Sequence, residues 1–205
     1  MKRKLLTLFS ACVLCAAGAS AQNGSIGVYL DSEGTTCSGQ TSANPLEGSI
    51  WANLGGAGAS GITGAEFRVV NDFPSDYLVV ATPNPEANVV IGNPFDLLGV
   101  NIAFPTCKTD ARVRLFTFQV IALNGAPPAD SWLTLKQRYD YTNPNFPCPL
   151  VVLCDSEFFA LACVGAPDSD HWRAVVNPSV GTSADCEPVA VESTSWSSIK
   201  DLYRN

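Results

Sequence analysis

The chain has 205 residues, with 19 Asp and Glu against 12 Lys and Arg. Its net charge of −7 at pH 7 argues against binding to nucleic acid or to an anionic membrane surface, because both carry negative charge. A single histidine argues against a metal centre built from histidine ligands.

Residues 1–21 are predicted to be a secretory signal peptide. Met1-Lys2-Arg3-Lys4 precedes an apolar run over 5–17, and Ala19-Ser20-Ala21 provides small residues for signal peptidase. We expect cleavage before Gln22, with an uncleaved anchor as the alternative. The mature protein is then secreted or periplasmic, which also allows association with the cell surface.

Cleavage changes the charge of the chain and leaves it without a membrane span. The three charges of the signal are basic, so 9 Lys and Arg remain against 19 Asp and Glu, a net charge of −10. No later apolar run approaches the roughly 20 residues that cross a bilayer, so we expect no transmembrane segment in the mature chain.

Short runs rich in β-branched and aromatic residues recur between clusters of Gly, Pro, Asn and Asp, and they predict strands. The predicted strands cover residues 26–30, 49–53, 66–70, 77–82, 89–91, 100–104, 113–122, 132–137, 150–153, 158–164 and 172–176. Such a series predicts an all-β fold, an antiparallel β-sandwich of the jelly-roll kind. Pro127 and Pro128 separate a sandwich region, 22–125, from a cysteine-rich β region, 126–190, which we expect to continue the sandwich.

Six cysteines remain after signal cleavage, and an even number in an exported chain predicts three disulfides. They are Cys37, Cys107, Cys148, Cys154, Cys163 and Cys186. Cys37 and Cys107 are the two in the first region, so we expect them to pair. A hairpin turning near 155–157 would set Cys148 opposite Cys163, which leaves Cys154 for Cys186. Spacing alone also allows other pairings.

Residues 191–205 predict a short C-terminal α-helix. Ser193-Thr194-Ser195 offers capping hydroxyls, and an apolar stripe follows at helical spacing. The stripe consists of Trp196, Ile199, Leu202 and Tyr203. Because so short a helix is unstable alone, we expect the stripe to dock on its own domain, with a partner protein as the alternative.

Catalytic and metal-binding patterns are sparse. The glycine-rich stretch 55–61 lacks the spacing of a P-loop or a dinucleotide site and predicts an inter-strand loop. Asp31-Ser32-Glu33 and Asp168-Ser169-Asp170 place oxygens in predicted turns, so calcium is the alternative to a solvated turn at each. His171 follows the second turn, but no G-x-S-x-G nucleophile motif accompanies it. We expect no other cofactor.

Four aromatic residues cluster in the second region, in and beyond a predicted strand. They are Trp132, Tyr139, Tyr141 and Phe146. Aromatic rings of this kind either stack on a ligand such as a sugar or pack in a core, and the sequence allows both.

Two stretches resemble known proteins. Thr63–Val70, Gly99–Phe104 and Leu115–Val120 are similar, in this order, to strands of cohesin-like and related carbohydrate-binding jelly-roll domains. The segment Glu192–Arg204 resembles the end of uncharacterised secreted bacterial proteins, which have no activity to carry over. The first resemblance implies a two-sheet fold with an adhesive or scaffolding role. The cysteine-rich second region departs from it.

These observations predict a secreted, non-catalytic binding or scaffolding β-sandwich that recognises a protein or a glycan. The alternative is a secreted hydrolase that uses two paired carboxylates. No local motif singles out such a pair among the 19 acidic residues.

Overall fold

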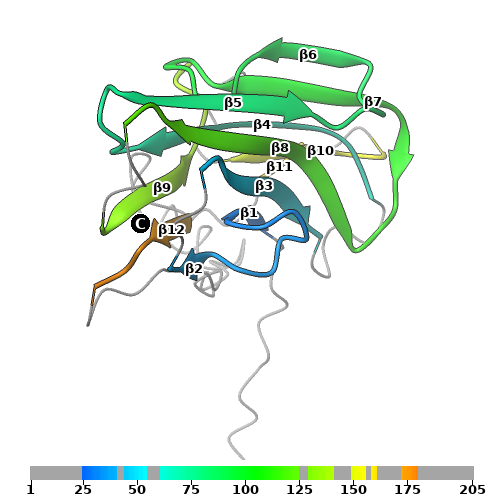
Figure 1. Ribbon diagram of the computed structural model, residues 1–205. Helices are drawn as coiled ribbons and strands as arrows, with labels where there is room; N and C mark the ends of the chain where they lie inside the picture. Colours follow the sequence, from blue (N-terminus) through cyan, green and yellow to red (C-terminus); the bar gives the residue numbers. More distant parts are fainter. Residues whose placement is uncertain are drawn as a thin grey trace, which may run out of the picture.

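A computed structural model describes residues 25–40, 44–54, 61–124, 129–140, 149–155, 158–160 and 172–179. In these ranges the chain forms strands and no helix (Figure 1). The strands are β1 (Ser25–Tyr29), β2 (Ser38–Gly39), β3 (Leu46–Asn53), β4 (Ile62–Asn71), β5 (Tyr77–Pro83), β6 (Val89–Gly92), β7 (Val100–Lys108), β8 (Arg112–Ala122), β9 (Ser131–Lys136), β10 (Leu150–Leu153), β11 (Phe158–Ala160) and β12 (Trp172–Val176).

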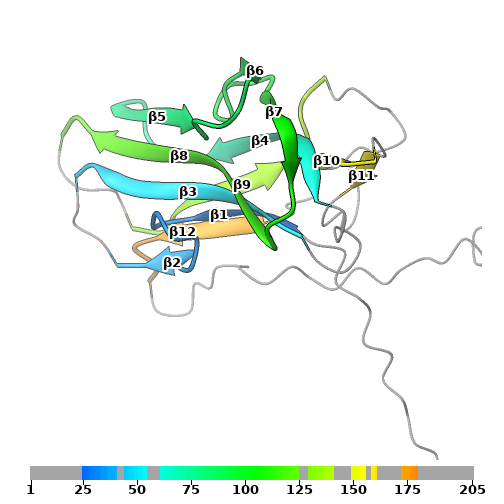
Figure 2. The ribbon, with the colours of Figure 1, turned by 90° about the vertical axis from the view of Figure 1, so that its right-hand side faces the viewer.

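The strands form two sheets that face each other (Figures 1 and 2). The smaller sheet has the order β1-β3-β8-β5. In the larger sheet, β10 and then β9 pair with successive parts of one edge of β4, while β11 pairs with β10, β12 with β9 and β2 with β12. On the other edge of β4, β7 and then β6 extend the sheet. All pairs are antiparallel except β12 with β2. The predicted all-β sandwich is therefore confirmed.

The core lies between the inner faces of the two sheets. Alternate residues of each strand point inward, so Ile102 and Phe104 of β7 are buried against the opposite sheet. On β8 the alternation shifts at a bulge, which leaves the neighbours Leu115 and Phe116 both buried. Phe116 meets Phe67 of β4 edge to face, with ring centroids 6.1 Å apart, and so joins the two layers.

All eleven predicted strands coincide with or overlap observed ones. The strand β2 was not predicted; it has only two residues and pairs with the distant β12. The predicted signal peptide 1–21 and C-terminal helix 191–205 lie outside the described residues. Strands on both sides of Pro127 and Pro128 pair in one sheet, since β9 and β10 both pair with β4.

Two of the three predicted disulfides are wrong, because Cys107 is bonded to Cys154 with their Cα atoms 5.5 Å apart. Neither Cys37–Cys107 nor Cys154–Cys186 can therefore form. The cause is the strand order. Ile62, at the start of β4, lies opposite Lys108 of β7 on one side and Leu153 of β10 on the other, so the ends of β7 and β10 meet there.

Gly61 stands next to the Cys107–Cys154 bond, and a Cβ on it would lie 2.9 Å from the Cys107 sulfur, so a side chain there would crowd the bridge. Cys37 is also disulfide-bonded, to a cysteine outside the described residues. Cys148 with Cys163 stays a prediction, because both lie outside the described residues.

Candidate functional site

A hollow of about 430 Å³ opens on the outer face of the larger sheet, across β6, β7, β4 and β10. Its lining is mostly apolar and comes from Thr63, Gly64, Ala65, Glu66, Val89, Asn101, Ile102, Ala103, Phe104, Leu150 and Val152. A volume of this size lies in the range of small-molecule sites, roughly 300–1,000 Å³.

The hollow exists because small residues meet at the middle of a cross-strand row. Val89, Ala103, Gly64 and Val152 are successive partners across the four strands. Ala103 and Gly64 leave the floor low, while the valines at the two ends of the row form walls. A Cβ on Gly64 would lie 2.9 Å from the carbonyl oxygen of Ile102, so the floor is backbone in close contact.

The next row supplies the polar end of the hollow. Asn101 lies opposite Glu66, with Ile91 and Leu150 beyond them. In the orientation that satisfies both of its amide atoms, Asn101 donates to Glu66 Oε2 at 2.9 Å and accepts from Arg138 Nη1 at 2.8 Å. Arg138 Nε is 3.1 Å from Asp140 Oδ1. The buried Glu66 carboxylate thus sits at one end of a chain of polar contacts.

An exposed aromatic ring stands beside this polar end. Tyr139 is 61% exposed, and its ring centroid is 5.6 Å from the guanidinium carbon of Arg68. Arg68 follows Glu66 by two residues on β4, so both face outward. The Tyr139 N–H donates to the Leu98 carbonyl at 3.1 Å, which ties the tyrosine to the connection between β6 and β7.

The four predicted ligand-facing aromatics divide between separate places. Tyr139 lies next to the hollow. Trp132, near the start of β9, has the guanidinium carbon of Arg173 5.3 Å from its ring centroid. The two rings therefore contact different arginines on different parts of the sheet. Tyr141 and Phe146 lie outside the described residues.

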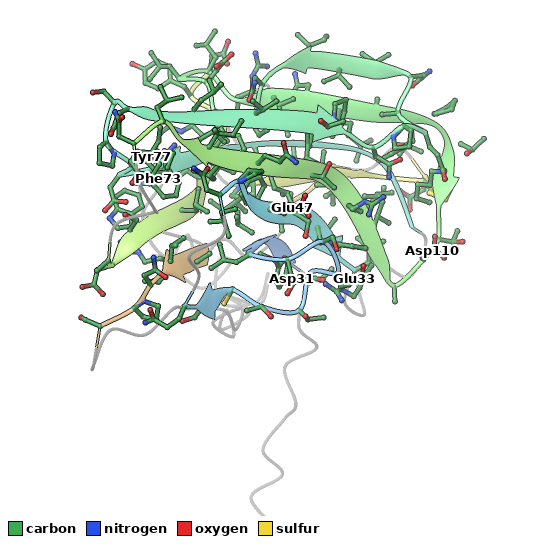
Figure 3. The ribbon with its side chains drawn as sticks, viewed as in Figure 1. Asp31, Glu33, Glu47, Phe73, Tyr77 and Asp110 are labelled. Carbon is green, nitrogen blue, oxygen red and sulfur yellow. A yellow bond between two sulfur atoms is a disulfide. The ribbon has the colours of Figure 1, made fainter. Side chains whose placement is uncertain are left out.

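The first predicted calcium turn uses its carboxylate internally. Asp31 Oδ1 accepts from the Thr35 N–H at 3.0 Å, and Oδ2 accepts from the Thr35 hydroxyl at 2.9 Å. Figure 3 shows Asp31 and Glu33 in this turn, with Glu47 on the neighbouring strand β3 and Asp110 farther away. Within the described ranges no three His, Cys, Asp or Glu side chains gather to hold a metal ion. Asp168, Asp170 and His171 lie outside those ranges.

Partial burial raises the pKa of the Asp31 carboxyl, but hydrogen bonds from Thr35 and Thr36 outweigh it. The pKa of Asp31 therefore lies below its usual value, as expected for a carboxylate that accepts several hydrogen bonds.

The outer face of the smaller sheet has a different character. Trp51 lies under Arg112 and Arg114, with ring-to-guanidinium distances of 4.8 and 5.9 Å. A more polar trough of about 290 Å³ crosses β3, β8 and β5 beside this cluster, and Thr117 and Gln119 are part of its lining.

Sequence reasoning missed the residues that make the hollow. Gly64, Glu66, Asn101 and Ala103 belong to strands that were predicted, but nothing local shows that β7 and β10 flank β4. The one local signal is the small residue at an outward position of each strand, Gly64 and Ala103.

No helix among the described residues is long and apolar enough to cross a membrane. No protein-family model matches the chain, and no curated protein matches it. Among solved structures, the chain is similar to a "Cohesin module from Clostridium perfringens ATCC13124 family 33 glycoside hydrolase", with 13% sequence identity and a TM-score of 0.45. The match covers 78% of this chain and 100% of that module. This module belongs to the kind of domain that the sequence resembles. No function, partner or site residue is carried over from it to this chain.

Proposed function

We propose that the protein is an exported, non-catalytic binding domain, and that the hollow on its larger sheet takes part of a neutral glycan. The observation that carries this proposal is the composition of the hollow: an apolar floor and walls, one polar end, and an exposed tyrosine beside it. Binding sites for small ligands combine such apolar surface with a few placed polar groups.

The chemistry of a sugar matches this arrangement. The C–H face of a pyranose can lie on the floor at Gly64 and Ala103, while ring hydroxyls reach the Glu66 carboxylate and the Asn101 amide. The next ring along the chain can stack on Tyr139, because an exposed tyrosine offers an apolar face. The strongly acidic chain disfavours anionic glycans, since the net charge would repel them.

The hydrolase alternative has less support. Glycoside hydrolysis by paired carboxylates needs two carboxyl groups about 5–9.5 Å apart on either side of the scissile bond. Of the described residues that line the hollow, Glu66 is the only one with a carboxyl group. Binding without turnover is the function this composition favours.

The test is binding of the mature chain to a panel of immobilised neutral oligosaccharides, followed by calorimetry with the best of them. Ala103→Trp fills the hollow and should abolish binding. Tyr139→Ala should weaken binding by about tenfold, the loss of one aromatic stacking contact.

The matched control is Thr117→Trp, which adds the same bulk at an outward position on β8 of the smaller sheet. It should bind like the unmodified chain. The proposal fails if no neutral oligosaccharide binds, or if Ala103→Trp and the unmodified chain bind equally well.

A further inference from the structure

Exposed large apolar side chains are concentrated in one short stretch of this protein. Five of them fall between residues 89 and 98, in β6 and in the connection from β6 to β7. They are Val89, Val90, Ile91, Leu97 and Leu98. All four residues of β6 are exposed, although the strand is almost wholly apolar.

The strand β6 is also an open edge of the larger sheet. Among the described strands it pairs with β7 and with no other. Figures 1 and 2 both place β6 at the rim of the sandwich, with no other coloured strand beyond it. Its outer side therefore presents backbone N–H and C=O groups that a further strand can pair with.

Three of the devices that keep a sheet edge from pairing are missing at β6, although the strand itself is only four residues long. Natural edges carry charged side chains, proline within the strand or a bulge. Residues 87–95 contain no charged residue, and the single proline, Pro94, comes after the strand. The ladder between β6 and β7 runs without a register shift.

We propose that β6 pairs antiparallel with β6 of a second copy of this chain, on a two-fold axis through Val90. In this register Val90 faces its own copy, and Val89 faces Ile91 of the other chain. Two copies of this acidic chain repel each other wherever their charges meet. Residues 87–95 carry no charge, so this stretch is a place where two copies can approach each other. An isologous pair needs a self-complementary surface, and a Val-Val-Ile strand provides one.

The dimer would join two larger sheets into one continuous sheet. Paired residues share a face, so the outer faces of both copies point the same way and the two hollows open on the same side. This consequence alone rests on the proposed glycan site. Two sites on one side bind a multivalent glycan surface more tightly than one site does, without any new contact.

The pairing is tested by sedimentation of the mature chain over a wide range of concentrations. Three residues of β6 from each copy pair in this register and make a small interface, so we expect a weak dimer whose apparent mass doubles as the concentration rises. Val90→Lys places two like charges on the axis and should raise the dimer dissociation constant by about tenfold or more. The matched control is Val80→Lys, since Val80 on the edge strand β5 has a similar exposure, 42% against 38% for Val90. It should dimerise like the unmodified chain.

A second variant keeps the test decisive if Val90→Lys fails to fold. Val90→Cys should be cross-linked to its own copy by a short bismaleimide, and Val80→Cys should not. A chain that stays monomeric at every concentration overturns the proposal. So does a dimer that survives Val90→Lys, or one that both lysine variants weaken alike. Glycan binding by a monomeric chain would leave the proposed function standing while refuting the dimer.

Discussion

Asp31 closes the turn that follows β1 and covers one end of the smaller sheet. Its carboxylate accepts hydrogen bonds from both the backbone and the hydroxyl of Thr35. Its backbone carbonyl accepts a hydrogen bond from the hydroxyl of the buried Ser49, and Ser49 in turn accepts one from Trp51 at 2.8 Å. An acidic turn that suggests calcium in the sequence thus has a structural role of its own.

Asp31→Asn should lower the melting midpoint at pH 7 by about 1–3 °C, because the turn loses charge-assisted hydrogen bonds at a solvent-exposed site. The folded pKa of Asp31 is below the unfolded value near 3.8, so this stability is complete above about pH 4 and is lost as the pH falls further. The difference between the melting midpoints of the two chains should therefore narrow as the pH falls from 7 to 3. A constant difference across that range would contradict this role.

Gly48 is required by the close approach of β3 to its neighbours. It pairs with Phe118 on β8, and a Cβ there would overlap the Phe118 ring and lie 2.6 Å from the carbonyl oxygen of Tyr29. Gly48→Ala should lower the free energy of unfolding by about 1–3 kcal/mol through overpacking. Guanidinium denaturation measures it. The exposed neighbour Glu47, changed to alanine, should stay within about 0.5 kcal/mol of the unmodified chain.

Among the elements, β4 organises the larger sheet. It pairs with β7 along one edge and with β10 and then β9 along the other. The hollow, its polar end and the Cys107–Cys154 disulfide all follow from this position, because β7 and β10 come from distant parts of the chain. The C-terminal helix with its Trp196 stripe stays a prediction, and it does not enter this arrangement.

Removing the disulfide should weaken the junction of β7 and β10. The bond closes a loop with a sequence separation of 47 residues. The double variant Cys107→Ser, Cys154→Ser should therefore lose about 3–4 kcal/mol of unfolding free energy in the chain-entropy account. Denaturant titration of the double variant against Thr106→Ser, the conservative change next to Cys107, measures this loss. Identical midpoints would show that the strand contacts alone hold the junction.

For the molecule as a whole, the disulfides support the proposed export. Cys107–Cys154 leaves Cys148, Cys163 and Cys186 as the cysteines after the predicted signal peptide with which Cys37 can pair. Because Cys37 lies between β1 and β2, its disulfide would link this connection covalently to the second half of the chain. Such cross-links suit a protein that works outside the reducing cytoplasm.

Mass spectrometry of the exported protein should find Gln22 as its first residue, because Ala19-Ser20-Ala21 offers the small residues that signal peptidase requires. Peptide mapping without reduction should join the peptide of Cys107 to that of Cys154, and Cys37 to one of the three remaining cysteines. A peptide that retains residues before Ala19 would refute the cleavage. A Cys37–Cys107 peptide would refute the structural pairing.

Eleven of the twelve strands in the described residues could be predicted from the local sequence, together with the alternation of their faces. The run 113–122 predicts a strand, and the observed β8 covers it with its inward residues buried. Val89–Ile91 predicts a strand as well. Such predictions succeed because β-branched and aromatic residues prefer a pleated backbone, and because burial on one face imposes a period of two on the sequence.

Which strands are neighbours depends on the tertiary fold. Pairing is a contact between residues far apart in the chain, and the alternation of one strand carries no information about its partner. That is why the predicted Cys37–Cys107 bond is wrong, and why the two-residue strand β2, which exists through its pairing with β12, was missed. The hollow has the same origin: Gly64 and Ala103 are ordinary small residues until β4 and β7 bring them side by side.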